Sequence, residues 1–126
     1  MIELDDNNRY LQIAFNDDLR LVMQTLPRIP QSDRIFIEAG TPYIKREGMQ
    51  GIRAIRKGWP GHVVADLKVT DGALGEVNMA YQAGATAATV FGNAPPESLN
   101  LFIERCAQLN MLSMIDLLGA DDPLQI

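Results

Sequence analysis

Apolar residues along the chain change repeatedly from the two-residue period of a strand to the wider spacing of a helix. The segment YLQIAF places Leu11, Ile13 and Phe15 on one face of a strand, with polar or small residues between them. Four later segments are comparably short and apolar. The five predicted strands are Tyr10–Phe15, Ile35–Ala39, His62–Val69, Thr86–Phe91 and Met111–Leu117.

Between these strands, apolar residues return every three or four positions, which predicts amphipathic helices. The first helix begins after a cap at Asp17 or Asp18 and ends before Pro27. The breaker run Gly40-Thr41-Pro42 closes the second strand, and a looser helical pattern then ends at Gly58. The expected buried faces are Leu19, Val22, Met23 and Leu26; then Met49, Ile52, Ile55 and Trp59; then Leu74, Val77 and Tyr81 within Gly72–Gln82; and, after Pro95 and Pro96, Leu99, Phe102, Ile103 and Cys106.

Strands that alternate with helices favour a parallel α/β fold over a bundle or a sandwich. Eight units of the length found here would need roughly 200 residues, the lower range of an eight-stranded βα barrel. We therefore expect residues 1–126 to form a single domain, a partial (β/α)8 TIM-type barrel of about five strands. The bare edges of its first and fifth strands predict pairing with another copy, an open sheet, or a fragment of a longer protein.

Composition narrows the classes of function. The 126 residues include 11 Lys and Arg against 16 Asp and Glu, and the net charge of −5 argues against nucleic acid as a partner. The single cysteine excludes an internal disulfide framework. The apolar runs are far shorter than the ~20 residues that cross a bilayer, and the acidic start MIELDDNNRY does not fit a secretion signal. We expect a soluble cytoplasmic protein with no membrane contact.

Polar side chains collect at the C-terminal ends of the predicted strands, the rim where parallel βα architectures bind ligands. Asp66 and Lys68 are two residues apart on a strand and share a face, and Asp71 lies where the chain turns into the next helix. Such an array can hold a divalent cation through its carboxylates and use the lysine as a proton donor or oxyanion partner. The rim residues are Asn16, Asp17, Glu38, Asp66, Lys68, Asp71, Asn93 and Asp116.

The segment ADLKVTDGALGEVNMAYQAGA, with IEAGTPYIKREGM and LQIAFN before it, resembles the orotidine 5′-phosphate decarboxylase suprafamily. Within it, the sequence is most similar to the 3-hexulose-6-phosphate synthases, and next to the 3-keto-L-gulonate 6-phosphate decarboxylases. The resemblance runs from about Tyr10 to Pro123 and covers the first five of eight βα units. Its specific part is the D-x-K-x-x-D element at Asp66, Lys68 and Asp71, with I-E-x-G-T-P one unit upstream.

This resemblance implies aldol addition of formaldehyde to ribulose 5-phosphate, or its reversal, through a metal-stabilised enediolate. It implies that Glu38 and Asp66 bind Mg²⁺ and that Lys68 stabilises the enediolate or protonates carbon. Asp71 corresponds to an aspartate that reaches across a dimer interface into the neighbour's site. The family's first-strand aspartate falls on Asn16, an amide that can hydrogen-bond to substrate but carries no charge. The implied partners are a phosphorylated sugar and a second copy of the chain.

Two other functions stay open. One is a catalytically silent half-barrel with a structural or ligand-binding role. The resemblance covers only the first five βα units, and in the family the later units supply a histidine, an arginine and the loops that hold the substrate phosphate. The other is a decarboxylase of the same suprafamily that acts on 3-keto-L-gulonate 6-phosphate or orotidine 5′-phosphate. His62 begins the third strand on the face away from the predicted site and replaces none of these groups. Asp116 is either a substrate-binding carboxylate or a helix N-cap.

Several residues have plainer interpretations. Glu38 alone would read as a surface residue, and Asp66 with Lys68 as a structural ion pair. Cys106 lies in an apolar stripe and is expected to pack in the core rather than act as a thiol nucleophile. A solvated basic helix face is expected for Lys45, Arg46, Arg53, Arg56 and Lys57.

Overall fold

Five parallel strands form a single sheet in the computed structural model, which describes residues 3–126. The strands lie side by side in chain order, so that β1 and β5 are the two edges. The parallel α/β prediction is confirmed, and each strand end lies within one residue of its predicted position. The strands are β1 (Leu11–Phe15), β2 (Ile35–Ala39), β3 (Val63–Val69), β4 (Ala87–Phe91) and β5 (Leu112–Asp116).

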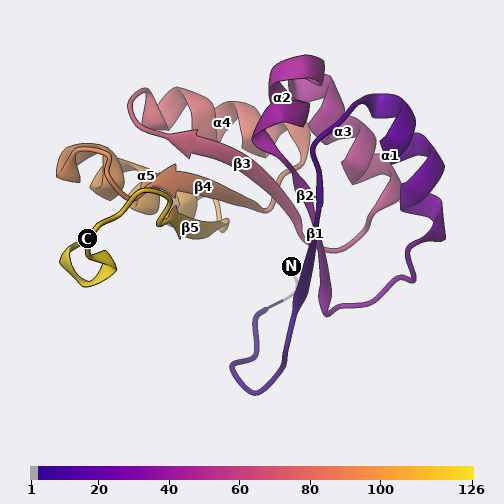
Figure 1. Ribbon diagram of the computed structural model, residues 1–126, viewed down its shortest axis with the longest axis horizontal. Coiled ribbons are helices and arrows are strands. Elements are labelled where there is room, and N and C mark those ends of the chain that lie inside the picture. The colour runs from indigo at the N-terminus through magenta and orange to yellow at the C-terminus, as the bar shows by residue number, and fades with distance from the viewer. Residues whose placement is uncertain (1–2) are drawn as a thin grey trace.

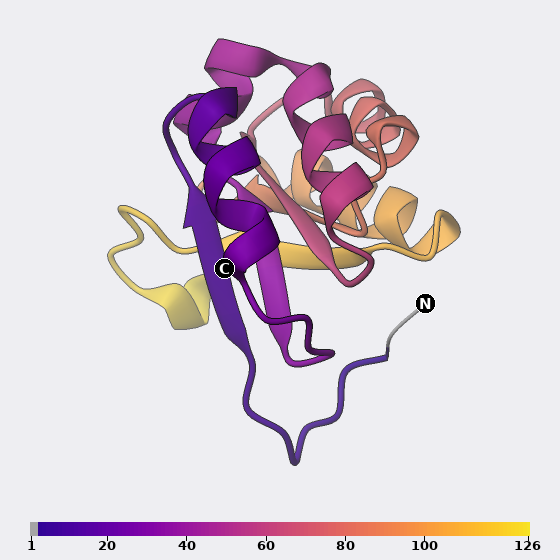
Figure 2. The ribbon, with the colours of Figure 1, turned by 90° about the vertical axis from the view of Figure 1, so that its right-hand side faces the viewer.

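The α-helices cover one face of the sheet and leave the other face open (Figures 1 and 2). This is the arrangement expected of successive βα units, because each right-handed crossover returns on the same side of the sheet. The helices are α1 (Leu19–Thr25), α2 (Thr41–Glu47), α3 (Met49–Gly58), α4 (Ala73–Ala83) and α5 (Pro96–Gln108), with short 3-10 turns at η1 (Leu26–Arg28) and η2 (Pro123–Gln125).

Alternation along the strands separates two apolar clusters. The main core lies between sheet and helices and includes Ile37, Ala65 and Val90. A smaller cluster on the opposite face is formed by buried Phe36 and Val64, packed with Ala87 and flanked by partly buried Tyr10, Leu112 and Met114. Because side chains two apart share a face, Glu38, Asp66 and Asp116 lie on this second, open face. In a closed βα barrel this is the face that lines the interior.

The first two helices show how local sequence sets their starts. Asp18, not Asp17, caps α1, and its carboxylate accepts a hydrogen bond of 3.1 Å from the Leu21 backbone nitrogen. The second strand ends at Ala39, just before Gly40-Thr41-Pro42, as predicted, but helix α2, which the sequence did not predict, begins at Thr41. Gly40 is extended at the N-cap, and the proline falls in the first turn, where its missing N–H leaves no helix bond unmade.

The predicted buried faces are right in part. Val22, Leu26, Val77, Phe102 and Cys106 are buried as expected. On α4, however, the buried residues besides Val77 are alanines, while Leu74 and Tyr81 are 48% and 47% exposed. Small side chains let a helix lie close to the sheet, so size alone is a poor guide to which residues face inward. The other residues expected to be buried but found exposed are Leu19, Met23 and Ile103.

Arg56 differs from the exposed basic face predicted for it. Its guanidinium donates hydrogen bonds to the backbone carbonyls of Trp59, Gly61 (2.7 Å) and Gly84 (3.3 Å). Burial lowers the pKa of this side chain from its ordinary value. Arg56 thus joins the end of α3 to the end of α4 beneath the N-terminal ends of the strands, whereas Arg53 on the same helix is exposed.

His62 lies at the N-terminal end of β3, far along the strand from Asp66. It is 2% exposed, its Nδ1 is 2.7 Å from Thr86 Oγ1, and its ring packs edge-on against Phe36. Since Phe36 belongs to the open-face cluster, His62 shares a sheet face with Asp66, contrary to the prediction, but lies at the opposite end.

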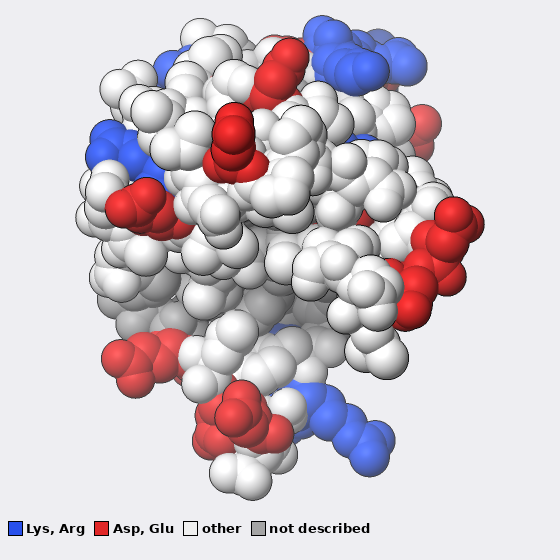
Figure 3. Space-filling model, turned by 90° about the vertical axis from the view of Figure 1, so that its left-hand side faces the viewer, with Lys and Arg blue, Asp and Glu red and all other residues white. Residues whose placement is uncertain are grey.

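Among residues 3–126, no helix is both long and apolar enough to span a membrane. On the face shown in Figure 3, described acidic side chains are dispersed, and the Lys and Arg side chains form separate small groups. This agrees with the acidic balance of the sequence, 16 Asp and Glu against 11 Lys and Arg.

Candidate functional site

The site is built around an irregularity at the C-terminal end of β3. Ala65 pairs with Ala88 and Val69 with Val90, so three residues of β3 face the single residue Thr89 of β4. Within this bulge Lys68 has a φ of 46°, a left-handed conformation that is uncommon for a residue with a side chain. Bulges of this kind redirect side chains near active sites.

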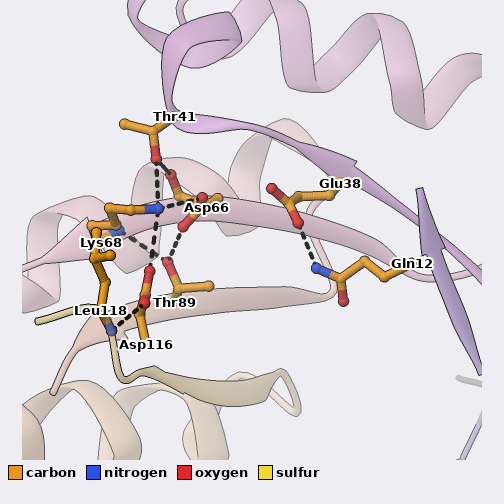
Figure 4. Close-up of polar contacts among 8 residues, drawn as sticks. All are labelled: Gln12, Glu38, Thr41, Asp66, Lys68, Thr89, Asp116 and Leu118. Carbon is orange, nitrogen blue, oxygen red and sulfur yellow. Dashed lines mark hydrogen bonds and ion pairs between the residues drawn. The ribbon is translucent and has the colours of Figure 1, made fainter. Parts of the chain in front are cut away.

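The Lys68 ammonium lies among three oxygen-bearing side chains, those of Asp66 on β3, Asp116 on β5 and Thr41 at the start of α2 (Figure 4). Its Nζ is 2.6 Å from Asp66 Oδ2, 3.2 Å from Asp116 Oδ2 and 3.3 Å from Thr41 Oγ1. Burial by itself would lower the pKa of Lys68, but the hydrogen bonds and charges of the two aspartates outweigh it and raise the pKa. Lys68 is therefore a cation at neutral pH, able to donate hydrogen bonds but not to accept a proton.

The two aspartates are fixed by further contacts. Asp66 Oδ1 accepts a 2.8 Å hydrogen bond from the Thr89 hydroxyl. Asp116 Oδ1 accepts one of 2.9 Å from the Leu118 backbone nitrogen, which, with Lys68, lowers the pKa of this carboxyl below its ordinary value despite partial burial. The side chains of Asp66 and Asp116 are 14% and 21% exposed, so both are sheltered yet reachable from solvent.

Glu38 lies on the neighbouring strand but outside this network. It pairs in register with Val64, two residues before Asp66, and its Oε1 accepts a 2.6 Å hydrogen bond from Gln12 Nε2 on β1. Figure 4 shows Glu38 and Asp66 on the same side of the sheet, with Glu38 turned towards Gln12. Within residues 3–126, no group of three or more His, Cys, Asp or Glu side chains is arranged to hold a metal ion.

Asn16 and Asp71 are not drawn into the Lys68 network. Asn16 is exposed beyond β1, and its amide lies so close to Gly40 that any side chain at residue 40 would collide with it. Asp71 is exposed after β3, and its charge acts instead on Glu76, whose pKa is raised by burial and then by Asp71. Both residues remain at the C-terminal rim predicted for them.

Two threonines in the network were not anticipated from the sequence. Thr41 accepts from Lys68 Nζ and donates a 2.6 Å hydrogen bond to the Asp66 carbonyl. Thr89 is 8% exposed and bonds both Asp66 and Lys68. The available signal was weak: Thr89 is a polar residue inside the otherwise apolar run AATVF, at a position that faces the open side of the sheet.

A pocket of about 570 Å³ lies beside this rim, between the end of β4, the start of α5 and the segment after β5. Gly92 and Asn93 line it on one side, and Asp121 and Asp122 on the other. Two carboxylates make this pocket unfavourable for a phosphate group, although it lies at a helix N-terminus.

A sequence model of the family described as "Orotidine 5'-phosphate decarboxylase / HUMPS family" matches residues 9–126. The chain is 40% identical over 119 residues to a "Bifunctional enzyme Fae/Hps" of Methanothrix thermoacetophila and 36% identical over 121 residues to one of Methanocaldococcus jannaschii. These matches cover 93% of this chain but only 30% and 31% of the relatives. The chain thus spans about a third of the length of the curated relatives it matches.

Solved structures show the same relationship. A 3-hexulose-6-phosphate synthase from Salmonella typhimurium superimposes with a TM-score of 0.84 and 30% identity, over 90% of this chain and 54% of that one. A 3-keto-L-gulonate-6-phosphate decarboxylase from Vibrio cholerae gives a TM-score of 0.80 and 28% identity, over 86% of this chain and 51% of its own. The five-stranded sheet is therefore a partial TIM-like α/β fold, as predicted.

Proposed function

The chain belongs to the orotidine 5'-phosphate decarboxylase / HUMPS family, and we propose that it forms part of a sugar-phosphate lyase of the 3-hexulose-6-phosphate synthase type. The relatives named Fae/Hps and the superposition on a 3-hexulose-6-phosphate synthase support this choice of reaction. The observation that carries it is the Asp66–Lys68–Asp116 network, a sheltered cation between two carboxylates on the barrel-interior face.

In the proposed reaction, C1 of ribulose 5-phosphate loses a proton and forms a bond to the carbon of formaldehyde, whose oxygen gains a proton. Negative charge develops on the sugar oxygens as the C1 proton leaves. Lys68 donates hydrogen bonds to that charge, because its two aspartate partners keep it protonated. The partial burial of the network strengthens this interaction relative to bulk water.

We assign the divalent cation, Mg²⁺, to Glu38 and Asp66. Their donor chemistry fits, because Mg²⁺ is commonly held by one or two carboxylates and completes its shell with water and substrate oxygens. Both Asp66 oxygens already have protein partners, so the cation would share this carboxylate with Lys68 and Thr89. When bound, such a cation supplies charge neutralisation for adjacent oxygens. Asn16 and Asp116 are proposed to bind the substrate through hydrogen bonds.

We also propose that the chain works as a homodimer in which Asp71 contributes to the neighbouring site. Its exposure beyond β3, and the bare edges of β1 and β5, support an association between copies. Light scattering tests this: a species of twice the chain mass is expected, and a monomer at all concentrations would contradict it.

The lyase is tested by an assay of formaldehyde plus ribulose 5-phosphate with Mg²⁺, comparing the wild-type protein with Lys68→Ala and Asp66→Ala. Each substitution is expected to reduce kcat at least about 100-fold. Lys57→Ala, which removes an exposed lysine from α3, is the matched control and should keep wild-type turnover.

Absence of turnover at any protein concentration would reject the lyase and favour a silent half-barrel. Release of CO₂ from 3-keto-L-gulonate 6-phosphate or orotidine 5′-phosphate would instead identify a decarboxylase. Turnover that survives both substitutions would reject the assignment of Lys68 and Asp66.

A further inference from the structure

The bulge in β3 leaves one backbone group without its usual partner. In a regular parallel ladder the Lys68 N–H would bond a carbonyl of the neighbouring strand, but here three β3 residues face Thr89 alone. The Lys68 backbone nitrogen instead donates a 2.9 Å hydrogen bond to Thr89 Oγ1. A side-chain hydroxyl thus replaces a strand-to-strand bond at the one β3 residue with a positive φ.

The same hydroxyl also holds the carboxylate that pairs with the Lys68 ammonium. Thr89 Oγ1 donates its proton to Asp66 Oδ1 at 2.8 Å, while Asp66 Oδ2 contacts Lys68 Nζ at 2.6 Å. A hydroxyl has one proton to donate and lone pairs to accept, so it can bond a carboxylate and an N–H together. Of the standard side chains of similar size, only serine offers the same pair of bonds.

We propose that Thr89 is a positioning residue, whose hydroxyl links the Asp66 carboxylate to the Lys68 backbone and thereby fixes where the Lys68 ammonium is presented. This inference rests on the proposed lyase function and extends it to a residue that touches neither substrate nor cation. A left-handed backbone at a non-glycine residue persists only when its surroundings hold it there. Thr89 supplies that restraint from β4, at 8% exposure, where water does not replace it easily.

Thr86, the residue before β4, provides a matched control beside the same two strands. Its hydroxyl accepts a 3.0 Å hydrogen bond from the Val63 backbone nitrogen, so it also bonds an N–H of β3. It lies at the opposite end of β3, beside His62 rather than Lys68. Thr86→Val therefore removes a similar hydroxyl without touching the Asp66–Lys68 pair.

Amide hydrogen exchange and backbone chemical shifts of Lys68, measured by NMR without substrate or metal, test the restraint directly. Thr89→Val should speed exchange of the Lys68 amide about tenfold relative to wild type and shift its resonances. Thr89→Ser should stay within about twofold of wild type. Thr86→Val should accelerate the Val63 amide but leave Lys68 within about twofold. Thr89→Ala gives the same comparison if the valine variant does not fold.

A Lys68 amide that is equally protected in wild type and in the variant without the hydroxyl would overturn the proposal. So would a Thr86→Val variant that changes Lys68 as much as Thr89→Val does, because the effect would then be global.

Kinetics separate positioning from a general loss of stability. Thr89→Val should lower kcat about 10- to 100-fold with little change in KM, Thr89→Ser should restore most of it, and Thr86→Val should change neither more than about twofold. An inactive wild-type protein whose Lys68 amide still responds to Thr89→Val overturns the proposed function alone. An active one whose kcat ignores Thr89→Val overturns the positioning role alone.

Discussion

The N-terminal and C-terminal ends of β3 are held by the same kind of hydrogen bond, but in different surroundings. At each end a threonine accepts a hydrogen bond from a β3 backbone nitrogen: Thr86, the residue before β4, from Val63, and Thr89 of β4 from Lys68. Around the Thr86 hydroxyl the partners are the backbone N–H and carbonyl of Val63 and the buried His62, and the strand is regular. Around Thr89 the partners are charged, part-exposed side chains, and the backbone takes up a positive φ.

This contrast separates the residues that stabilise the fold from the residues that we propose to take part in catalysis. The N-terminal end is closed by hydrogen bonds between the backbone and the side chains of Thr86 and Arg56, which suits stability. The C-terminal end keeps charged side chains partly buried and partly exposed to solvent, at the cost of a left-handed backbone at Lys68. This arrangement suits the binding of a ligand. Three sets of variants test this contrast.

The largest effect on stability is expected at the N-terminal end, from Arg56→Ala. The substitution removes hydrogen bonds from a charged group to three backbone carbonyls and leaves those carbonyls unpaired. We expect a loss of about 3 kcal/mol in the free energy of unfolding, measured by urea denaturation. Arg53→Ala, an exposed arginine on the same helix, should change it by less than about 0.5 kcal/mol. Equal losses of stability in the two variants would show that the three hydrogen bonds of Arg56 do not stabilise the fold.

A smaller effect is expected at the C-terminal end, where glycine and alanine at residue 68 can be compared. Both substitutions remove the ion pairs, so the difference between them reports the backbone. Because φ is 46°, Lys68→Gly should be more stable than Lys68→Ala by about 1 kcal/mol. At Leu67, whose φ is not positive, the order should reverse. Alanine as stable as glycine at residue 68 would show that the positive φ carries no strain.

The smallest effect is a dependence of stability on pH through Asp116. The Leu118 N–H and Lys68 lower its pKa in the folded state, so its contribution is present above the ordinary carboxyl pKa and is lost as pH falls through the lowered value. Asp116→Asn removes this contribution. The melting temperatures of wild type and variant should therefore differ at pH 7 and converge as the pH falls below the lowered pKa of Asp116. A difference that is constant with pH would mean that Asp116 acts through packing rather than charge.

The sequence predicted the positions of the helices and strands better than it predicted which of their residues are buried. Strands could be located because the apolar runs are short and bounded, and the Asp18 cap could be narrowed to two candidates. The start of α2 was missed because proline suits both a break and a first helical turn. The buried face of α4 was missed because alanines, rather than leucine and tyrosine, meet the sheet.

The candidate site could also be predicted only in part from the sequence. The spacing of Asp66 and Lys68 placed them on one face, and the structure brings them together with Asp116. It leaves Glu38 paired with Gln12, a contact between residues far apart in the sequence that no local pattern encodes, and leaves Asp71 to act through its charge on Glu76. Thr89 entered the site only through the register of β3 and β4, and Thr41 only because the start of α2 lies against Asp66.

By itself, the sequence determined the order and type of the elements, the family, and the rim on which the charged residues lie, because periodicity and motif spacing are local properties of the chain. Tertiary structure alone decided the bulge that faces Thr89, the left-handed Lys68 and the partners of each carboxylate. These depend on how neighbouring strands align, and a shift of one residue in that alignment would send every side chain to the other face.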